Sequence, residues 1–177
     1  MRFGALFSKA GLAVKLAGAV AVLAAAGAAL ARDPDRPTPS GFPVPRWVSL
    51  KFGDVNARSG PGDDYPAVWT YGVKGLPLIV IEETREWRKI CDSDGQSAWV
   101  HKRTLDGART VFRAADQPLP LLASPDPKAR VRAILAPRAL AGLDRCEGSW
   151  CRIHVENVRA WAPAAALWGA GPPNSCR

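Results

Sequence analysis

The most informative segment of the 177-residue chain is Val55-Asn56-Ala57-Arg58-Ser59-Gly60-Pro61-Gly62. Its first half alternates apolar and polar side chains, which is typical of a strand with one buried face. Its second half, continued by Asp63-Asp64, combines glycine, proline and aspartate, the residues that favour tight turns. The segment therefore predicts a short strand that ends in a turn.

The sequence on either side has the same character. Val48, Leu50 and Phe52 alternate with polar residues, which predicts that they share one face of a strand. Short strands without a convincing long amphipathic helix favour an all-β fold, either a small barrel or a sandwich. We expect further strands within residues 47–52, 76–81, 87–90 and 98–100, and a tight turn at 92–95.

The chain also contains an internal repeat. Trp87-Arg88-Lys89-Ile90 recurs as Trp150-Cys151-Arg152-Ile153, and other landmarks recur around it in the same order. The matched landmarks are Pro61 with Pro125, Trp99 with Trp161, Leu105 with Leu167 and Gly107 with Gly169. Two copies of a unit of roughly 60 residues account for most of the sequence after residue 45.

Three motifs of the first copy resemble those of bacterial SH3-like domains. The segment 55–62 fits a V-N-x-R-x-G-P-G opening, and Trp87–Ile90 fits a W-x-[KR]-[IV] strand. Gly95–Val100 fits the closing G-x-x-G-W-[VI] strand, except that Ala98 stands where glycine is usual. The second copy is degenerate, because residues 119–126 lack the asparagine, the arginine and the paired glycines.

The resemblance, which covers residues 46–169, implies an all-β exported protein of two tandem small SH3-like β-barrels. The barrels follow a signal peptide and a Pro-rich linker. The expected divisions are a signal peptide at 1–31, the linker at 32–45, barrel 1 at 46–108, the degenerate barrel 2 at 109–170 and a tail at 171–177.

The N-terminal sequence predicts export. Arg2, Lys9 and Lys15 precede an uncharged run from Leu16 to Leu30, and Ala29-Leu30-Ala31 fits a Sec-type cleavage site after Ala31. An uncleaved membrane anchor is the alternative, but the run is shorter than the ~20 residues of a spanning helix. We expect the five prolines between residues 32 and 46 to keep the linker extended and unpacked. The predicted location is periplasmic or secreted.

The charge of the chain gives a weak indication of partners. The formal net charge is +8, and removal of the three basic residues of the signal peptide leaves +5, a bias that serves solubility more often than binding. We expect no nucleic-acid partner and no membrane span after signal cleavage, and the sequence leaves the oligomeric state open.

Four cysteines in an exported chain favour disulfides. Alignment of Trp87 with Trp150 places Glu83 opposite Cys146 and Arg88 opposite Cys151. An opposite-charge pair in one copy and two cysteines in the other is the pattern of cross-strand neighbours, so a Cys146–Cys151 bridge is predicted. Cys91 and Cys176 remain, and the sequence does not decide whether they pair.

The resemblance singles out three ligand-binding candidates, Arg58, Tyr65 and Trp69. Tyr65 and Trp69 fall in the long segment after Gly62, which borders the binding groove in SH3-like barrels, and aromatic faces there can stack on prolines or sugars. The alternatives are that the aromatic residues cover the core and that Arg58 braces the loop. Core or seam packing is expected for Trp87, Trp99, Trp150 and Trp161.

We expect no enzymatic activity, metal or cofactor. His101 and His154 are the only histidines and fall in different barrels, away from a cysteine at a helix start. Asp92-Ser93-Asp94-Gly95 is interpreted as a hairpin turn because the rest of a calcium loop is missing.

The resemblance implies a non-catalytic periplasmic binding or adaptor module that contacts peptidoglycan or an envelope protein. One alternative is a structural or regulatory subunit with barrel 2 as an interaction face, and another is an accessory of a cell-wall hydrolase.

Overall fold

The structure, a computed structural model, describes residues 38–173 and Cys176. The predicted signal peptide and the first part of the predicted linker lie outside the described residues. No helix among the described residues has the length and hydropathy needed to cross a bilayer.

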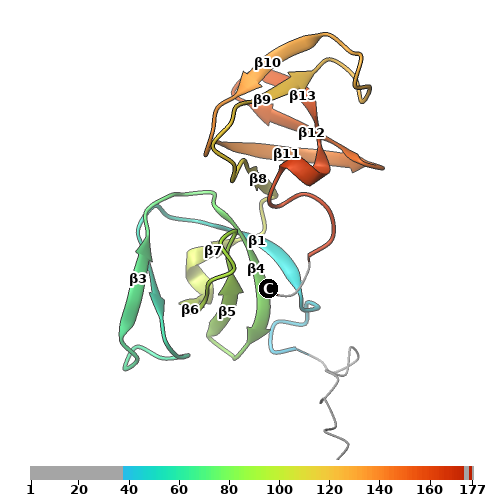
Figure 1. The fold of residues 1–177 in the computed structure, drawn as a ribbon. Helices are drawn as coiled ribbons and strands as arrows, with labels where there is room; N and C mark the ends of the chain where they lie inside the picture. The colour runs from blue at the N-terminus through green and yellow to red at the C-terminus, as the bar shows by residue number, and fades with distance from the viewer. Residues whose placement is uncertain (1–37, 174–175, 177) are drawn as a thin grey trace, which may run out of the picture. The chain divides into compact units, whose positions relative to one another are not determined.

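The first barrel consists of seven antiparallel strands in the order β3-β2-β6-β5-β4-β1-β7 (Figure 1). Alternating burial along β2 follows the alternation in its sequence, with Val55 and Ala57 inside. Its elements are β1 (Arg46–Leu50), β2 (Val55–Arg58), β3 (Ala67–Tyr71), β4 (Pro77–Glu83), β5 (Trp87–Cys91), β6 (Ser97–His101), the 3-10 turn η1 (Lys102–Thr104) and β7 (Leu105–Asp106).

The second barrel consists of six antiparallel strands in the order β10-β9-β13-β12-β11-β8 (Figure 1). Its elements are β8 (Thr110–Phe112), β9 (Leu119–Leu122), β10 (Val131–Leu135), β11 (Leu140–Glu147), β12 (Trp150–Val155), β13 (Val158–Pro163) and the 3-10 turn η2 (Ala164–Ala166). The all-β prediction of two tandem domains is confirmed.

The strand registers of the two barrels match position by position. In the first barrel Glu82 lies opposite Lys89 and Glu83 opposite Arg88. In the second, Arg145 lies opposite Arg152 and Cys146 opposite Cys151. Both hairpins shift register at the same place, just before these pairs, and such a bulge lets a long strand bend between two parts of a small barrel. Corresponding residues of the repeat therefore occupy equivalent places.

Each barrel has its own apolar core. In the first, Leu50, Leu78, Val80 and Ile90 are almost completely buried, and in the second Val111, Leu121 and Ile153 are. Trp87, Trp99 and Trp161 are buried as expected, and Trp150 is half-buried. The expectation for Phe52 is wrong: β1 ends at Leu50, and Phe52 is 48% exposed in the bend that follows.

The described end of the Pro-rich segment is packed, contrary to the expectation of an extended, unpacked linker. Val44 packs against the core of the first barrel, and the backbone and side chain of Ser40 both bond to Glu83. Fixed proline φ values make this segment costly to fold into regular structure, but they also reduce the entropy lost when it docks. Residues 38–45 are therefore part of the folded protein.

Two disulfides are present in the structure. Cys146 and Cys151 are joined across the β11–β12 hairpin, with Cα atoms 4.0 Å apart. Cys91, at the end of β5, is joined to Cys176 in the tail, with Cα atoms 5.6 Å apart. The tail is also held by the Trp47 indole, whose Nε1 donates to the Gly171 carbonyl oxygen at 3.0 Å. The pairing that the sequence left open is thus made.

Candidate functional site

Arg58, the last residue of β2, braces the turn that follows it. Its Nη1 donates to the carbonyl oxygens of Asp63 at 3.1 Å and Tyr65 at 2.7 Å. Its Nη2 lies 3.6 Å from the Asp63 carboxylate, and the side chain is 22% exposed. One guanidinium that binds two carbonyl groups of the same loop limits the conformations open to that loop. The bracing role considered for Arg58 is therefore present.

Tyr65 packs its ring onto the backbone of the glycine-rich turn. A Cβ atom at Gly60 would lie 2.3 Å from the Tyr65 ring, so only glycine permits this contact. The ring is nevertheless 46% exposed. The loop therefore presents an aromatic face to solvent in a position fixed by its own backbone and by Arg58.

Trp69 does not lie in the loop, as the sequence had suggested, but on β3. It pairs with Ala57 of β2 and packs partly against the core of the first barrel. Its ring meets that of Tyr71 edge-on, with centroids 6.0 Å apart. β3 was not predicted from the sequence because it is short and follows Pro66 directly. Trp69 thus covers the core, whereas Tyr65 faces outward.

Tyr71, also on β3, is hydrogen-bonded to the β5–β6 hairpin. Its hydroxyl donates to Asp92 Oδ2 at 2.9 Å in a buried position. Desolvation and the neighbouring Asp92 carboxylate raise the pKa of Tyr71 well above its usual range, so the phenol remains a hydrogen-bond donor. The Asp92 carboxylate also accepts from the backbone N–H groups of Asp94 and Gln96, which is the hairpin turn that the sequence predicted.

The second barrel lacks this braced loop. Leu122 occupies the place of Arg58, since both residues lie opposite the matched tryptophan of the closing strand. Backbone bonds, among them Ala123 N–H to the Arg130 carbonyl, close the corresponding turn. The two copies therefore share a fold but not this feature.

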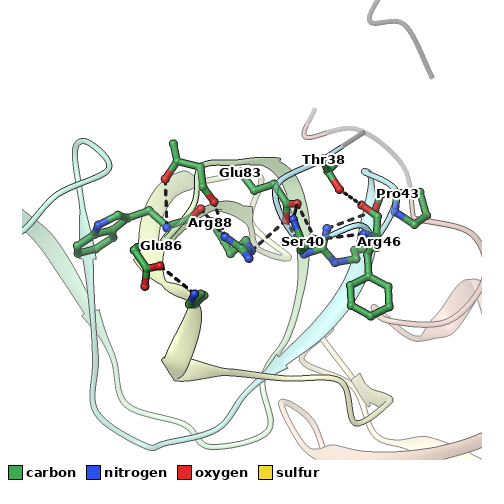
Figure 2. Close-up of polar contacts among 11 residues, drawn as sticks. Thr38, Ser40, Pro43, Arg46, Glu83, Glu86 and Arg88 are labelled. Carbon is green, nitrogen blue, oxygen red and sulfur yellow. Dashed lines mark hydrogen bonds and ion pairs between the residues drawn. The ribbon is translucent and has the colours of Figure 1, made fainter. Parts of the chain in front are cut away.

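A second polar arrangement, the Glu83 cluster, consists of Ser40, Arg46, Glu83 and Arg88 (Figure 2). Glu83 Oε1 accepts from Ser40 N at 2.9 Å and Ser40 Oγ at 2.6 Å. Glu83 Oε2 accepts from Arg46 Nη2 at 2.7 Å and lies 3.0 Å from Arg88 Nε. The Glu83 side chain is 1% exposed. The alignment predicted Glu83 and Arg88 as neighbours, but nothing in the sequence pattern pointed to Ser40.

The chemistry of this cluster is that of an anchor. Desolvation alone would raise the pKa of Glu83, but hydrogen bonds from Ser40 and Arg46 outweigh it and lower the pKa to about 2. A carboxylate so acidic and so completely paired is a poor proton acceptor near neutral pH. The cluster fixes residues 38–45 to the β4–β5 hairpin.

The described residues contain no group of three or more His, Cys, Asp or Glu side chains able to hold a metal ion. All four cysteines are in disulfides, so none supplies a thiolate nucleophile.

Comparison with known proteins agrees with the strand pattern and the repeat. The bacterial SH3 domain profile matches the chain twice, at residues 51–107 and 115–169. The chain belongs to the bacterial SH3 domain family. Domains of this family are often cell-wall binding modules and are typically extracellular or periplasmic. The bacterial SH3 assignment covers both barrels, the degenerate copy included.

Two solved structures similar to this bacterial SH3 protein are NlpC1 and NlpC2 from Trichomonas vaginalis, each 10% identical with a TM-score of 0.30. The matches cover 70% and 68% of this chain but only 45% and 47% of the two proteins, so the chain spans less than half of their length. No curated protein matches the chain.

Proposed function

We propose that this bacterial SH3 protein is a non-catalytic binding module of the periplasm and that peptidoglycan is its partner. The observation that carries the proposal is the braced loop of the first barrel, which holds the half-exposed ring of Tyr65 in place. Binding costs less free energy when the contacting side chain is already ordered. A fixed aromatic face suits stacking on the sugar rings of a glycan strand.

Replacing Tyr65 by alanine should weaken retention on purified peptidoglycan sacculi by about tenfold, because an aromatic anchor at a small interface contributes on the order of 1–2 kcal/mol. The thermal midpoint should shift by only a few degrees, since the ring is half-exposed. Co-sedimentation with sacculi and thermal unfolding measure the two quantities.

Two further variants separate binding from folding. Phe52→Ala removes a ring that is 48% exposed outside the loop and should leave retention unchanged. Trp69→Ala should lower the thermal midpoint because Trp69 packs on the core. Equal retention of wild type and Tyr65→Ala would contradict a role for the loop. A wild-type protein that sacculi do not retain but that forms a stable dimer would favour the structural-subunit hypothesis instead.

The proposal also places the mature protein in the periplasm. N-terminal mass analysis of the periplasmic protein from its native host should give a chain that begins at Arg32 or within a few residues of it, because the Ala29-Leu30-Ala31 sequence fits signal peptidase. A membrane-bound form that retains Met1 would contradict this.

A further inference from the structure

The outer face of β11, β12 and β13 carries an unusual group of basic side chains. This arginine face consists of Arg145, Arg152, His154 and Arg159, gathered around Asp144. Arg145 lies directly opposite Arg152, and His154 directly opposite Arg159. Arg145 and Arg152 are like charges in directly opposite positions, an arrangement that destabilises a sheet unless nearby acidic groups compensate for it.

The first barrel provides an internal comparison, because its residues occupy equivalent places. Where the second barrel has Arg145 and Arg152, the first has the ion pair Glu82–Lys89, with 3.8 Å between Oε2 and Nζ. Cys91 and Ser97 stand opposite each other where the second barrel has His154 and Arg159. The charge composition of the two barrels differs in the same direction. Residues 46–108 contain nine basic and nine acidic side chains, whereas residues 109–170 contain nine basic and five acidic side chains. The positive charge of the mature chain is thus concentrated in the second barrel.

Asp144 holds the side chains of the arginine face in place through their inner nitrogen atoms. The terminal Nη atoms of the arginines remain able to bind a ligand. Arg152 Nε and Arg159 Nε lie 3.7 Å and 3.4 Å from Asp144 Oδ2, and His154 Nδ1 lies 2.6 Å from Oδ1. His154 sits directly on Gly142, where a Cβ would lie 2.2 Å from the imidazole ring. Within the described part of the chain, the terminal Nη atoms of Arg152 and Arg159 bind no other side chain.

Arg145 is aligned from two sides. Its guanidinium lies 5.3 Å from the centroid of the Trp161 ring, and its Nε lies 2.6 Å from Glu147 Oε1. A hollow of about 260 Å³ adjoins it, lined by Arg109, Leu143, Asp144, Arg145, Cys146 and Gly171. Arg109 therefore adds a further cation at the edge of the face.

We propose that this arginine face binds carboxylate groups of the stem peptides of peptidoglycan, as a second contact besides the first-barrel loop. Guanidinium groups bind carboxylates through paired hydrogen bonds, and adjacent strands about 4.8 Å apart present such groups in a row. Stem peptides carry several free carboxylates on a short extended chain. The inference rests on the proposed function, because the partner is the same. It adds the chemical group of that partner, the carboxylate, that the second barrel recognises.

The test compares two triple variants by co-sedimentation with sacculi. Arg145→Gln/Arg152→Gln/Arg159→Gln should weaken retention by about tenfold or more. The control Lys51→Gln/Lys74→Gln/Arg103→Gln removes the same charge from exposed positions of the first barrel and should change retention less than about twofold. Retention of the wild type should also fall when salt rises from about 0.05 M to about 0.5 M.

Sacculi whose carboxylates have been amidated test the same inference with an unmutated protein. They should lose most of their wild-type binding. Full binding to amidated sacculi, or equal losses in the two triple variants, would overturn the arginine face while leaving the proposed function in place. Failure of the wild type to bind untreated sacculi would overturn both. If the wild type binds anionic lipid vesicles through these arginines and does not bind sacculi, the ligand of the arginine face is a lipid headgroup and not a stem peptide. That result would also overturn the inference.

Discussion

A double variant, Cys91→Ala/Cys176→Ser, should have a free energy of unfolding roughly 4 kcal/mol lower than that of the wild type. The two cysteines are 85 residues apart, and the bridge runs from the end of β5 to the tail, so the closed loop contains the whole second barrel. A crosslink that closes so long a loop removes a large part of the conformational entropy of the unfolded chain.

The second disulfide supplies the matched control. Cys146 and Cys151 are only five residues apart, so Cys146→Ser/Cys151→Ala should cost less, roughly 2 kcal/mol. Urea denaturation followed by tryptophan fluorescence, under oxidising conditions, measures both losses. Equal losses in the two double variants would mean that loop entropy is not the source of the stabilisation by the Cys91–Cys176 bridge.

The two disulfides also show which contacts a sequence can reveal. Cys146 and Cys151 belong to one hairpin, and the repeat places them over Glu83 and Arg88, so local strand pairing was enough to predict neighbours. Cys91 and Cys176 meet only because the tail returns to the first barrel, where the Trp47 indole donates to the Gly171 carbonyl at 3.0 Å. Contacts of this kind depend on tertiary packing and leave no periodic signal.

The braced loop of the first barrel was predicted in part from the sequence. Its motif fixed the turn and the position of Arg58, because glycine and proline restrict the backbone locally. Trp69 was misplaced because the five residues of β3 lie mostly exposed at a sheet edge, so their alternation is weak. The arginine face could not be predicted from the charge total, since strand register, not composition, gathers Arg145, Arg152 and Arg159 on one side.

Glu83→Gln should destabilise the protein by about 3 kcal/mol and lower the thermal midpoint on the order of 15 °C. Glutamine retains an acceptor for Ser40 but removes the charge between Arg46 and Arg88, whose side chains are 19% and 7% exposed. Two arginines left near each other at low exposure lose their common counter-ion. Differential scanning calorimetry at neutral pH measures the change.

An exposed carboxylate in the same barrel is the control. Glu86 bonds to Lys102 Nζ at 2.9 Å but is 46% exposed, so Glu86→Gln should leave the midpoint nearly unchanged. Similar decreases of the thermal midpoint in the two variants would show that burial of Glu83 does not strengthen its ion pairs.

The pH dependence should identify the Glu83 charge as the cause. The folded pKa of about 2 lies below the value of about 4.5 of a free glutamate, so the stabilisation is complete above pH 4.5 and is lost as the pH falls toward 2. The stability of the wild type should therefore approach that of Glu83→Gln over this interval, whereas the gap should be constant between pH 6 and 8. A gap that stays open at pH 2 would mean that the variant loses packing rather than charge, and the docking of residues 38–45 would then not depend on this carboxylate.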